Sequence, residues 1–73
     1  MIRAKWNSDN VANTQSVFFS DVDEPVYPMV GDEYELYDED NSRTVIATVS
    51  RVHFPSKMIY LEPDWSTLID TCE

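Results

Sequence analysis

The chain has 73 residues, a net charge of -9 and a hydrophobic fraction of 42%. This length suits one domain with one small core, and we expect a single domain over residues 1–73. The length excludes an enzyme with a deep cleft between two lobes, and the charge disfavours direct binding to nucleic acid.

The start of the chain and its one cysteine indicate a compartment. The first residues contain no apolar run of signal-peptide length, and no stretch approaches the ~20 apolar residues of a membrane span. Cys72 is the only cysteine, so a disulfide within the chain is impossible and a reducing compartment is favoured. We therefore expect a cytoplasmic protein.

The N-terminal part predicts two short strands separated by a loop. Residues 2–6 alternate between apolar and basic side chains, which is typical of a half-buried strand. Residues 8–15 are polar and irregular and predict a loop, and the apolar run at 17–19 predicts a second strand. Residues 21–28 are too acidic and too rich in proline for a central strand.

The middle of the chain predicts three strands joined by tight turns. After a turn at Gly31, residues 33–37 alternate between acidic and apolar or aromatic side chains. Residues 44–53 are rich in β-branched side chains and predict a long strand, with a bulge near Ser50 where the apolar phase shifts. Residues 57–62 predict the fifth strand.

The connections complete the predicted fold. The Asp, Glu, Asn and Ser residues at 38–42 favour a turn, as does the segment at 54–56. Asp64 is placed to cap a helical turn carrying apolar residues at helical spacing up to Ile69. We predict a mostly β fold, either a small antiparallel barrel or a strongly bent five-stranded sheet, with at most one short C-terminal helical turn. The order of elements over residues 30–65 is similar to that of SH3-like and Tudor-like barrels.

The sequence lacks a set of residues for catalysis or metal binding. Nucleophilic catalysis needs a base beside the nucleophile and a third group that orients the base, and His53 is the only histidine. The run Asp38-x-Asp40-x-Ser42 is similar to the opening of a calcium loop. However, Arg43 and Val49 stand where that loop needs its glycine and its bidentate glutamate. We expect neither an enzyme nor a metal or cofactor site.

Acidic residues are concentrated in the first part of the chain. Between Trp6 and Ser42 there are ten acids and no lysine or arginine. These acids are Asp9, Asp21, Asp23, Glu24, Asp32, Glu33, Glu35, Asp38, Glu39 and Asp40. Such a field speeds the approach of a basic partner surface, and the alternative is that it only keeps a small domain soluble.

Strand alternation leaves aromatic and methionine side chains outside the expected core. Residues of this kind are enriched where proteins dock, although a barrel with both ends plugged would bury several of them. We predict a partner-binding surface made of these outward residues and the nearby acids. Its members are Asp32, Glu33, Glu35, Tyr37, Asp38, Glu39, Asp40, Met58 and Tyr60. An open edge of the N-terminal strand, with Arg3 and Lys5 facing out, is a second possible docking device.

The compact size, the strong acidity and the lack of a catalytic set of residues together suggest a family. In overall character the chain resembles the small transcription regulators that phages of Xanthomonas direct against host RNA polymerase. This resemblance implies a non-enzymatic protein in the host cytoplasm, and the high net charge favours a monomer. The resemblance also implies binding to a polymerase core subunit, a block of sigma-dependent initiation and an effect on termination. The acid clusters Asp32-Glu33-x-Glu35 and Asp38-Glu39-Asp40 would then face a basic polymerase surface.

Three other functions are compatible with the sequence. A DNA mimic would place its carboxylates along one ridge with the spacing of phosphates. An SH3-like or Tudor-like peptide reader would bring together at least three of its rings, as capture of a cation requires. The candidate rings are Tyr34, Tyr37, Phe54, Tyr60 and Trp65. A structural subunit of a virion or of a larger complex is the third.

Overall fold

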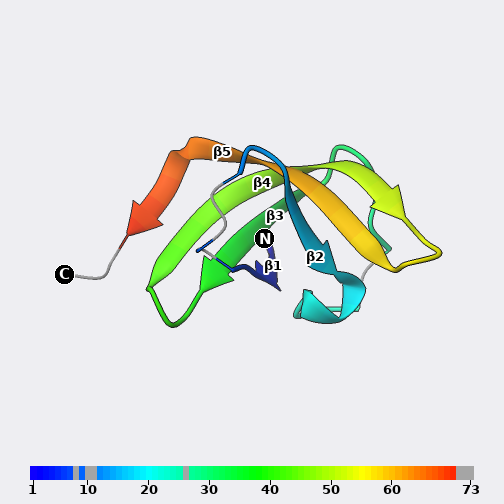
Figure 1. Cartoon of the computed structure of the whole chain (residues 1–73), viewed down its shortest axis with the longest axis horizontal. Helices are drawn as coiled ribbons and strands as arrows, with labels where there is room; N and C mark the ends of the chain where they lie inside the picture. The colour runs from blue at the N-terminus through cyan, green and yellow to red at the C-terminus, as the bar shows by residue number, and fades with distance from the viewer. Residues whose placement is uncertain (8, 10–11, 26, 71–73) are drawn as a thin grey trace.

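The computed structural model describes residues 1–7, 9, 12–25 and 27–70. Within them lie β1 (Ile2–Lys5), β2 (Gln15–Phe18), the 3₁₀ turn η1 (Phe19–Asp21), β3 (Glu33–Asp38), β4 (Arg43–His53) and β5 (Met58–Asp70). The five strands form one sheet in the order β1-β3-β4-β5-β2 (Figure 1). The described residues hold no helix that is long and apolar enough to pass through a membrane.

The sheet is mixed, and its two edges do not close into a barrel. β3, β4 and β5 form an antiparallel meander, and β2 pairs antiparallel with the first residues of β5. β1 instead lies parallel to β3, with Ile2 opposite Tyr34. The predicted bent five-stranded sheet is confirmed, and the alternative of a small antiparallel barrel is not formed. A parallel pair needs a long crossover, and here the chain through β2 and up to residue 32 supplies it.

A turn at Gly31 leads into β3, as predicted. Gly31 has a φ of 96°, a left-handed conformation that favours glycine. The Asp32 carboxylate accepts the N–H of Met29 at 3.0 Å, and the Asp32 carbonyl accepts the N–H of Val49 at 2.8 Å. These bonds fix the start of β3 against β4, after which the strand alternates between the core and the outward face.

Two irregularities interrupt the long pairing of β4 with β5. One lies between Val49 and Arg51, which confirms the bulge predicted from the phase shift. The other lies between Thr44 and Ile46, where a longer excursion of β5 is inserted. Because a bulge bends its strand and increases the local twist, the first irregularity bends β4 at Ser50 and the second bends β5.

The helical turn predicted at residues 64–69 is wrong, because β5 continues through them as a strand. Asp64 does perform the local task of a capping residue, since its Oδ1 accepts the N–H of Ser66 at 3.1 Å and the hydroxyl of Ser66 at 2.6 Å. The excursion is then tied to β4, because Thr67 Oγ1 accepts the N–H of Ile46 at 2.9 Å. The apolar residues that suggested a helical turn therefore lie in the part of β5 where the register with β4 is interrupted.

The core lies on one face of the bent sheet and takes residues from all five strands. Its buried apolar members are Ala4, Trp6, Val17, Tyr34, Leu36, Val45, Ala47, Val49, Ile59 and Leu61. The sequence predicted that Gln15 is in a loop, because it is polar. The structure instead places Gln15 at the start of β2, where it is buried. Its Oε1 accepts the indole N–H of Trp6 at 3.3 Å, and its Nε2 donates to the Ala12 carbonyl at 2.7 Å. The Trp6 ring also contacts Trp65, with the centroids 6.0 Å apart.

The first prediction concerns Tyr34, which is 1% exposed and whose hydroxyl has no hydrogen-bond partner within the described part of the chain. A buried polar group without a partner costs about 1–3 kcal/mol. Tyr34→Phe removes this oxygen and keeps the ring. We expect its free energy of unfolding at neutral pH, measured by urea denaturation, to equal the wild-type value or exceed it by up to about 2 kcal/mol. A clear loss of stability would contradict the structure.

The same variant carries a pH signature. Burial, with the charge of Asp32 adding to it, raises the pKa of Tyr34 above its ordinary value of 10.0. Because the unfolded chain ionises this tyrosine first, its contribution is intact below pH 10 and is lost as the pH rises through the folded pKa. Tyr34→Phe should therefore lose less stability than the wild type on going from about pH 9 to about pH 11.

Candidate functional site

The nine residues predicted to bind a partner fall at different places along the sheet. The end of β3 and the β3–β4 turn contain four of them, Tyr37, Asp38, Glu39 and Asp40. Three others precede or belong to the first half of β3, namely Asp32, Glu33 and Glu35. The last two, Met58 and Tyr60, lie at the start of β5. β4 runs between the β3–β4 turn and the β4–β5 hairpin and has 11 residues, which corresponds to roughly 30 Å. Figure 1 shows this turn and this hairpin at opposite ends of the molecule. The structure therefore gathers the acids of residues 38–40 with Tyr37 but leaves Met58 and Tyr60 far from them.

Asp38 organises the β3–β4 turn. Its Oδ1 accepts the N–H of Asp40 at 3.0 Å, and its Oδ2 accepts the side-chain amide of Asn41 at 2.8 Å. Glu39 and Asp40 are exposed, and their carboxylates form no hydrogen bond or ion pair within the described residues. The predicted turn is confirmed, and it presents these two carboxylates to solvent. The described ranges contain no group of three or more His, Cys, Asp or Glu residues arranged to hold a metal.

An open hollow of about 470 Å³ lies beside this turn, where β1 and β2 approach each other. Its lining residues are Lys5, Trp6, Asn7, Asp9, Ser16, Asp21, Asp38, Asp40 and Asn41. Four aspartates and a single lysine thus line the hollow. Asp9 and Asp21 were counted among the acids of the sequence but were not predicted to bind a partner, because only the fold brings them to the same hollow. The Asp21 carboxylate also accepts the N–H of Phe18 at 2.8 Å, so Asp21 lies beside the end of β2 that pairs with the start of β5. We refer to Asp9, Asp38, Glu39 and Asp40 as the acidic end.

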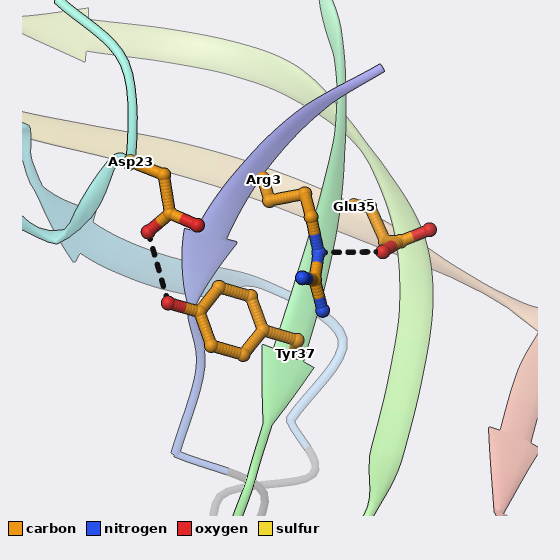
Figure 2. A network of polar contacts seen from close by, with 4 residues as sticks. All are labelled: Arg3, Asp23, Glu35 and Tyr37. Carbon is orange, nitrogen blue, oxygen red and sulfur yellow. Dashed lines mark hydrogen bonds and ion pairs between the residues drawn. The ribbon is translucent and has the colours of Figure 1, made fainter.

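Tyr37 and Glu35 belong to a network that joins β1 and β3 to the segment after η1 (Figure 2). The Tyr37 hydroxyl donates to Asp23 Oδ1 at 2.9 Å, and the Arg3 guanidinium lies 4.3 Å from the centre of the Tyr37 ring. Arg3 Nε in turn donates to Glu35 Oε1 at 2.9 Å. Both residues therefore have partners inside the molecule.

The outer edge of β1 is partly covered by the same segment. The N–H of Asp23 donates to the carbonyl of Arg3 at 2.9 Å, and Ala4 forms an isolated antiparallel bridge with Val22. Covering an edge with a loop is a common protection against unwanted strand pairing. The N-terminal strand does lie at an edge of the sheet, but this contact reduces its capacity to accept a strand from a partner.

Met58 and Tyr60 lie on the outward face of the sheet, as the alternation of β5 predicts, and both are half-buried. Met58 is opposite Phe18 of β2, and the Tyr60 hydroxyl is 4.0 Å from the Met58 sulfur. The guanidinium of Arg51 lies 5.5 Å from the centre of the Tyr60 ring. These two residues therefore belong to the surroundings of the β4–β5 hairpin.

The rings considered for a peptide-reading cage have separate surroundings. Tyr34 is in the core, and Trp65 contacts Trp6. Tyr37 and Tyr60 lie beside two different arginines. No two of the five candidate rings contact each other among the described residues. The open cage that a Tudor-like reader requires is therefore not formed.

His53 and Ser56 are close enough to suggest a catalytic pair, with 2.6 Å between His53 Nδ1 and Ser56 Oγ. The same nitrogen accepts the N–H of Ser56 at 3.3 Å, and the Ser56 hydroxyl also reaches the His53 carbonyl at 3.5 Å. Within the described residues no carboxylate bonds the other ring nitrogen to orient it. The contact closes the four-residue hairpin turn and lacks the third group of a triad.

Comparison of the chain with protein-family models, curated proteins and solved structures finds no match. No relative therefore assigns a role to any of these residues, and the function is inferred from the charge and exposure of the chain's own side chains.

The second prediction tests the Tyr37 network. The hydrogen bond to Asp23 raises the pKa of the Tyr37 phenol above 10.0, while desolvation and the charges of Asp23 and Glu39 act in the same direction and Arg3 opposes them. Asp23→Ala removes the acceptor and its charge, so the pKa of Tyr37 should move back toward 10.0. The measurement is an NMR titration of the tyrosine ring carbons, with Tyr34 as the internal control whose pKa should not move. An unchanged Tyr37 titration would mean that the bond to Asp23 is absent in solution.

Proposed function

We propose that the chain is a non-enzymatic binding domain whose acidic end recognises a basic surface of another protein. The observation that carries this proposal is the hollow beside the β3–β4 turn, which is lined by four aspartates and one lysine, together with the exposed carboxylates of Glu39 and Asp40 in that turn. Carboxylates gathered at one end of a molecule attract a basic partner over several ångströms and orient it before contact.

The partner proposed is the core of bacterial RNA polymerase, in the cytoplasm of an infected cell. This choice comes from the resemblance to phage transcription regulators, which implies a block of sigma-dependent initiation and an effect on termination. The acidic end supports polymerase as the partner because its negative charge is complementary to a basic protein surface. The net charge of -9 also opposes direct contact of the chain with DNA.

The third prediction separates the acidic end from the net charge. Glu39→Gln with Asp40→Asn removes two exposed carboxylates from the acidic end, and Glu24→Gln with Glu62→Gln removes two exposed carboxylates elsewhere. We expect the first double variant to bind purified polymerase core roughly tenfold more weakly than the wild type, mainly through a slower association rate. The control should bind almost as the wild type does. Biolayer interferometry at several salt concentrations measures both, and the wild-type affinity should fall as salt rises.

Two results would count against the proposal. Equal binding by the two double variants would show that only the net charge matters and would remove the acidic end as the recognition surface. If the wild-type chain fails to bind polymerase core at moderate salt and leaves sigma-dependent transcription in vitro unchanged, polymerase is not the partner.

A further inference from the structure

The β4–β5 hairpin lies at the end of the molecule opposite the β3–β4 turn (Figure 1). Exposed aromatic side chains gather around this hairpin. Phe54, at the tip, contacts Phe19 edge-on at 5.8 Å and Tyr27 at 5.4 Å between ring centres. Phe54 nevertheless remains 45% exposed, Tyr27 is 73% exposed and Phe18 is 53% exposed. Sequence reasoning did not find this cluster, because it joins a turn residue to rings more than twenty positions away in the chain.

A second group of apolar side chains lies beside the hairpin, on the outward face of the sheet. The Asp21 carboxylate borders this group, because it accepts the N–H of Phe18 at 2.8 Å. Phe18 is paired with Met58 in the register of β2 and β5, and Met58 touches the Tyr60 hydroxyl. The N–H of Phe19 donates to the carbonyl of Lys57 at 3.0 Å, which ties β2 to the hairpin. Clustered exposed apolar side chains of this kind mark interaction sites in soluble proteins.

The positive charges of the chain are distributed unevenly between the two ends. Arg3 forms an ion pair with Glu35 at 2.9 Å, Arg43 forms one with Asp70 at 3.2 Å, and Lys5 lies in the acidic hollow. The other two basic residues, Arg51 and Lys57, are exposed and form no ion pair with the described residues. The Arg51 guanidinium lies 5.5 Å from the centre of the Tyr60 ring, and Lys57 belongs to the same turn as Phe54. We refer to Phe18, Tyr27, Arg51, Phe54 and Lys57 as the hairpin patch.

We propose that the hairpin patch binds a peptide segment of a partner protein in which acidic residues flank apolar anchors. The apolar anchors would cover Phe18, Tyr27 and Phe54, and the carboxylates would pair with Arg51 and Lys57. This assignment follows from charge complementarity, because these are the two cations of the described chain that are neither in an ion pair nor in the acidic hollow. The patch is a second docking surface, of opposite charge preference to the acidic end.

Charge also argues against the other occupants. A second copy of the chain would bring its whole net charge of -9 to the interface, and a nucleic acid would bring a continuous phosphate backbone. A short peptide brings only a few carboxylates, which can pair with Arg51 and Lys57. A basic peptide would meet Arg51 and Lys57 with like charge. An acidic peptide without apolar anchors would leave the exposed rings uncovered.

The experiment titrates the ¹⁵N-labelled chain with three synthetic peptides of equal length. The first alternates glutamate with leucine and phenylalanine, the second replaces every glutamate with lysine, and the third replaces every apolar residue with serine. We expect only the first to give saturable NMR shifts, centred on residues 18–19, 27 and 51–58. The affinity of so small a surface should be weak, with a Kd on the order of 0.1–1 mM.

Matched variants locate the site, and this is the fourth prediction. Lys57→Glu and Phe54→Ala should each weaken binding of the first peptide at least about fivefold. The first variant removes a charge that pairs with a peptide carboxylate, and the second removes a ring that contacts an apolar anchor. Lys5→Glu makes the same charge change, and Leu68→Ala removes another exposed apolar side chain, both away from the patch. These two controls should bind almost as the wild type does. Dispersed amide spectra of all four variants confirm that each remains folded.

Three outcomes would overturn the proposal. The first is failure of the glutamate–apolar peptide to shift the hairpin resonances. The second is equal binding of the lysine peptide at the same residues. The third is a concentration-dependent dimer in sedimentation that shifts those resonances in the absence of peptide, because the occupant would then be a second copy. None of these outcomes depends on polymerase binding, so this proposal and the proposed function stand or fall separately.

Discussion

The indole of Trp6 connects three parts of the sheet that are distant in sequence. Its backbone N–H continues the β1–β3 ladder by donating to the Tyr37 carbonyl at 2.8 Å, its ring N–H donates to Gln15 at the start of β2, and its face contacts Trp65 of β5. β1 and β2 are the two edges of the sheet, so this side chain holds the edges near each other without a closing strand pair. Trp6 also lines the hollow beside the β3–β4 turn.

The hollow and the hairpin patch give a very acidic chain two chemically different ends. At the acidic end, Asp38 is used to build the turn while Glu39 and Asp40 face solvent. At the other end, Arg51 and Lys57 lie beside exposed rings. The total charge hides this arrangement, because two cations contribute little to a sum of -9 but determine the local field around the hairpin.

Local patterns predicted the strands well, because alternation records which face of a strand is buried. The alternation of β3, the β-branched content of β4 and its phase shift near Ser50 all correspond to the observed strands and bulge.

The parallel pairing of β1 was not predictable, since alternation carries no information about the neighbouring strand. Gln15 was missed because a polar residue is buried only when partners such as the Trp6 indole are supplied by the fold. The residues after Asp64 misled the prediction, because an aspartate that accepts the N–H two positions later serves a helix start and a strand excursion equally well.

The sequence predicted which residues of the candidate surface face outward, but not how far apart they lie. The outward placement of Met58 and Tyr60 follows from alternation, and the acids of residues 38–40 form the turn expected of them. Their separation to opposite ends follows from the length of β4 and the strand order, which a single sequence does not reveal. Tyr37 took an internal role because the parallel β1 places Arg3 over its ring.

The strand order also constrains how the chain acquires its structure during synthesis. The first two strands emerge from the ribosome before their partners exist, because Ile2 pairs with Tyr34 and Val17 pairs with Ile59. The β3–β5 meander needs only short loops to close, whereas docking of both N-terminal strands must overcome the entropy of much longer loops. The segment that contains β1 and β2 therefore has no strand to pair with until β3 and β5 have been synthesised. Its polar and charged residues, from Arg3 and Lys5 to the residues before Gln15, help to keep it dissolved until the sheet is ready to receive it.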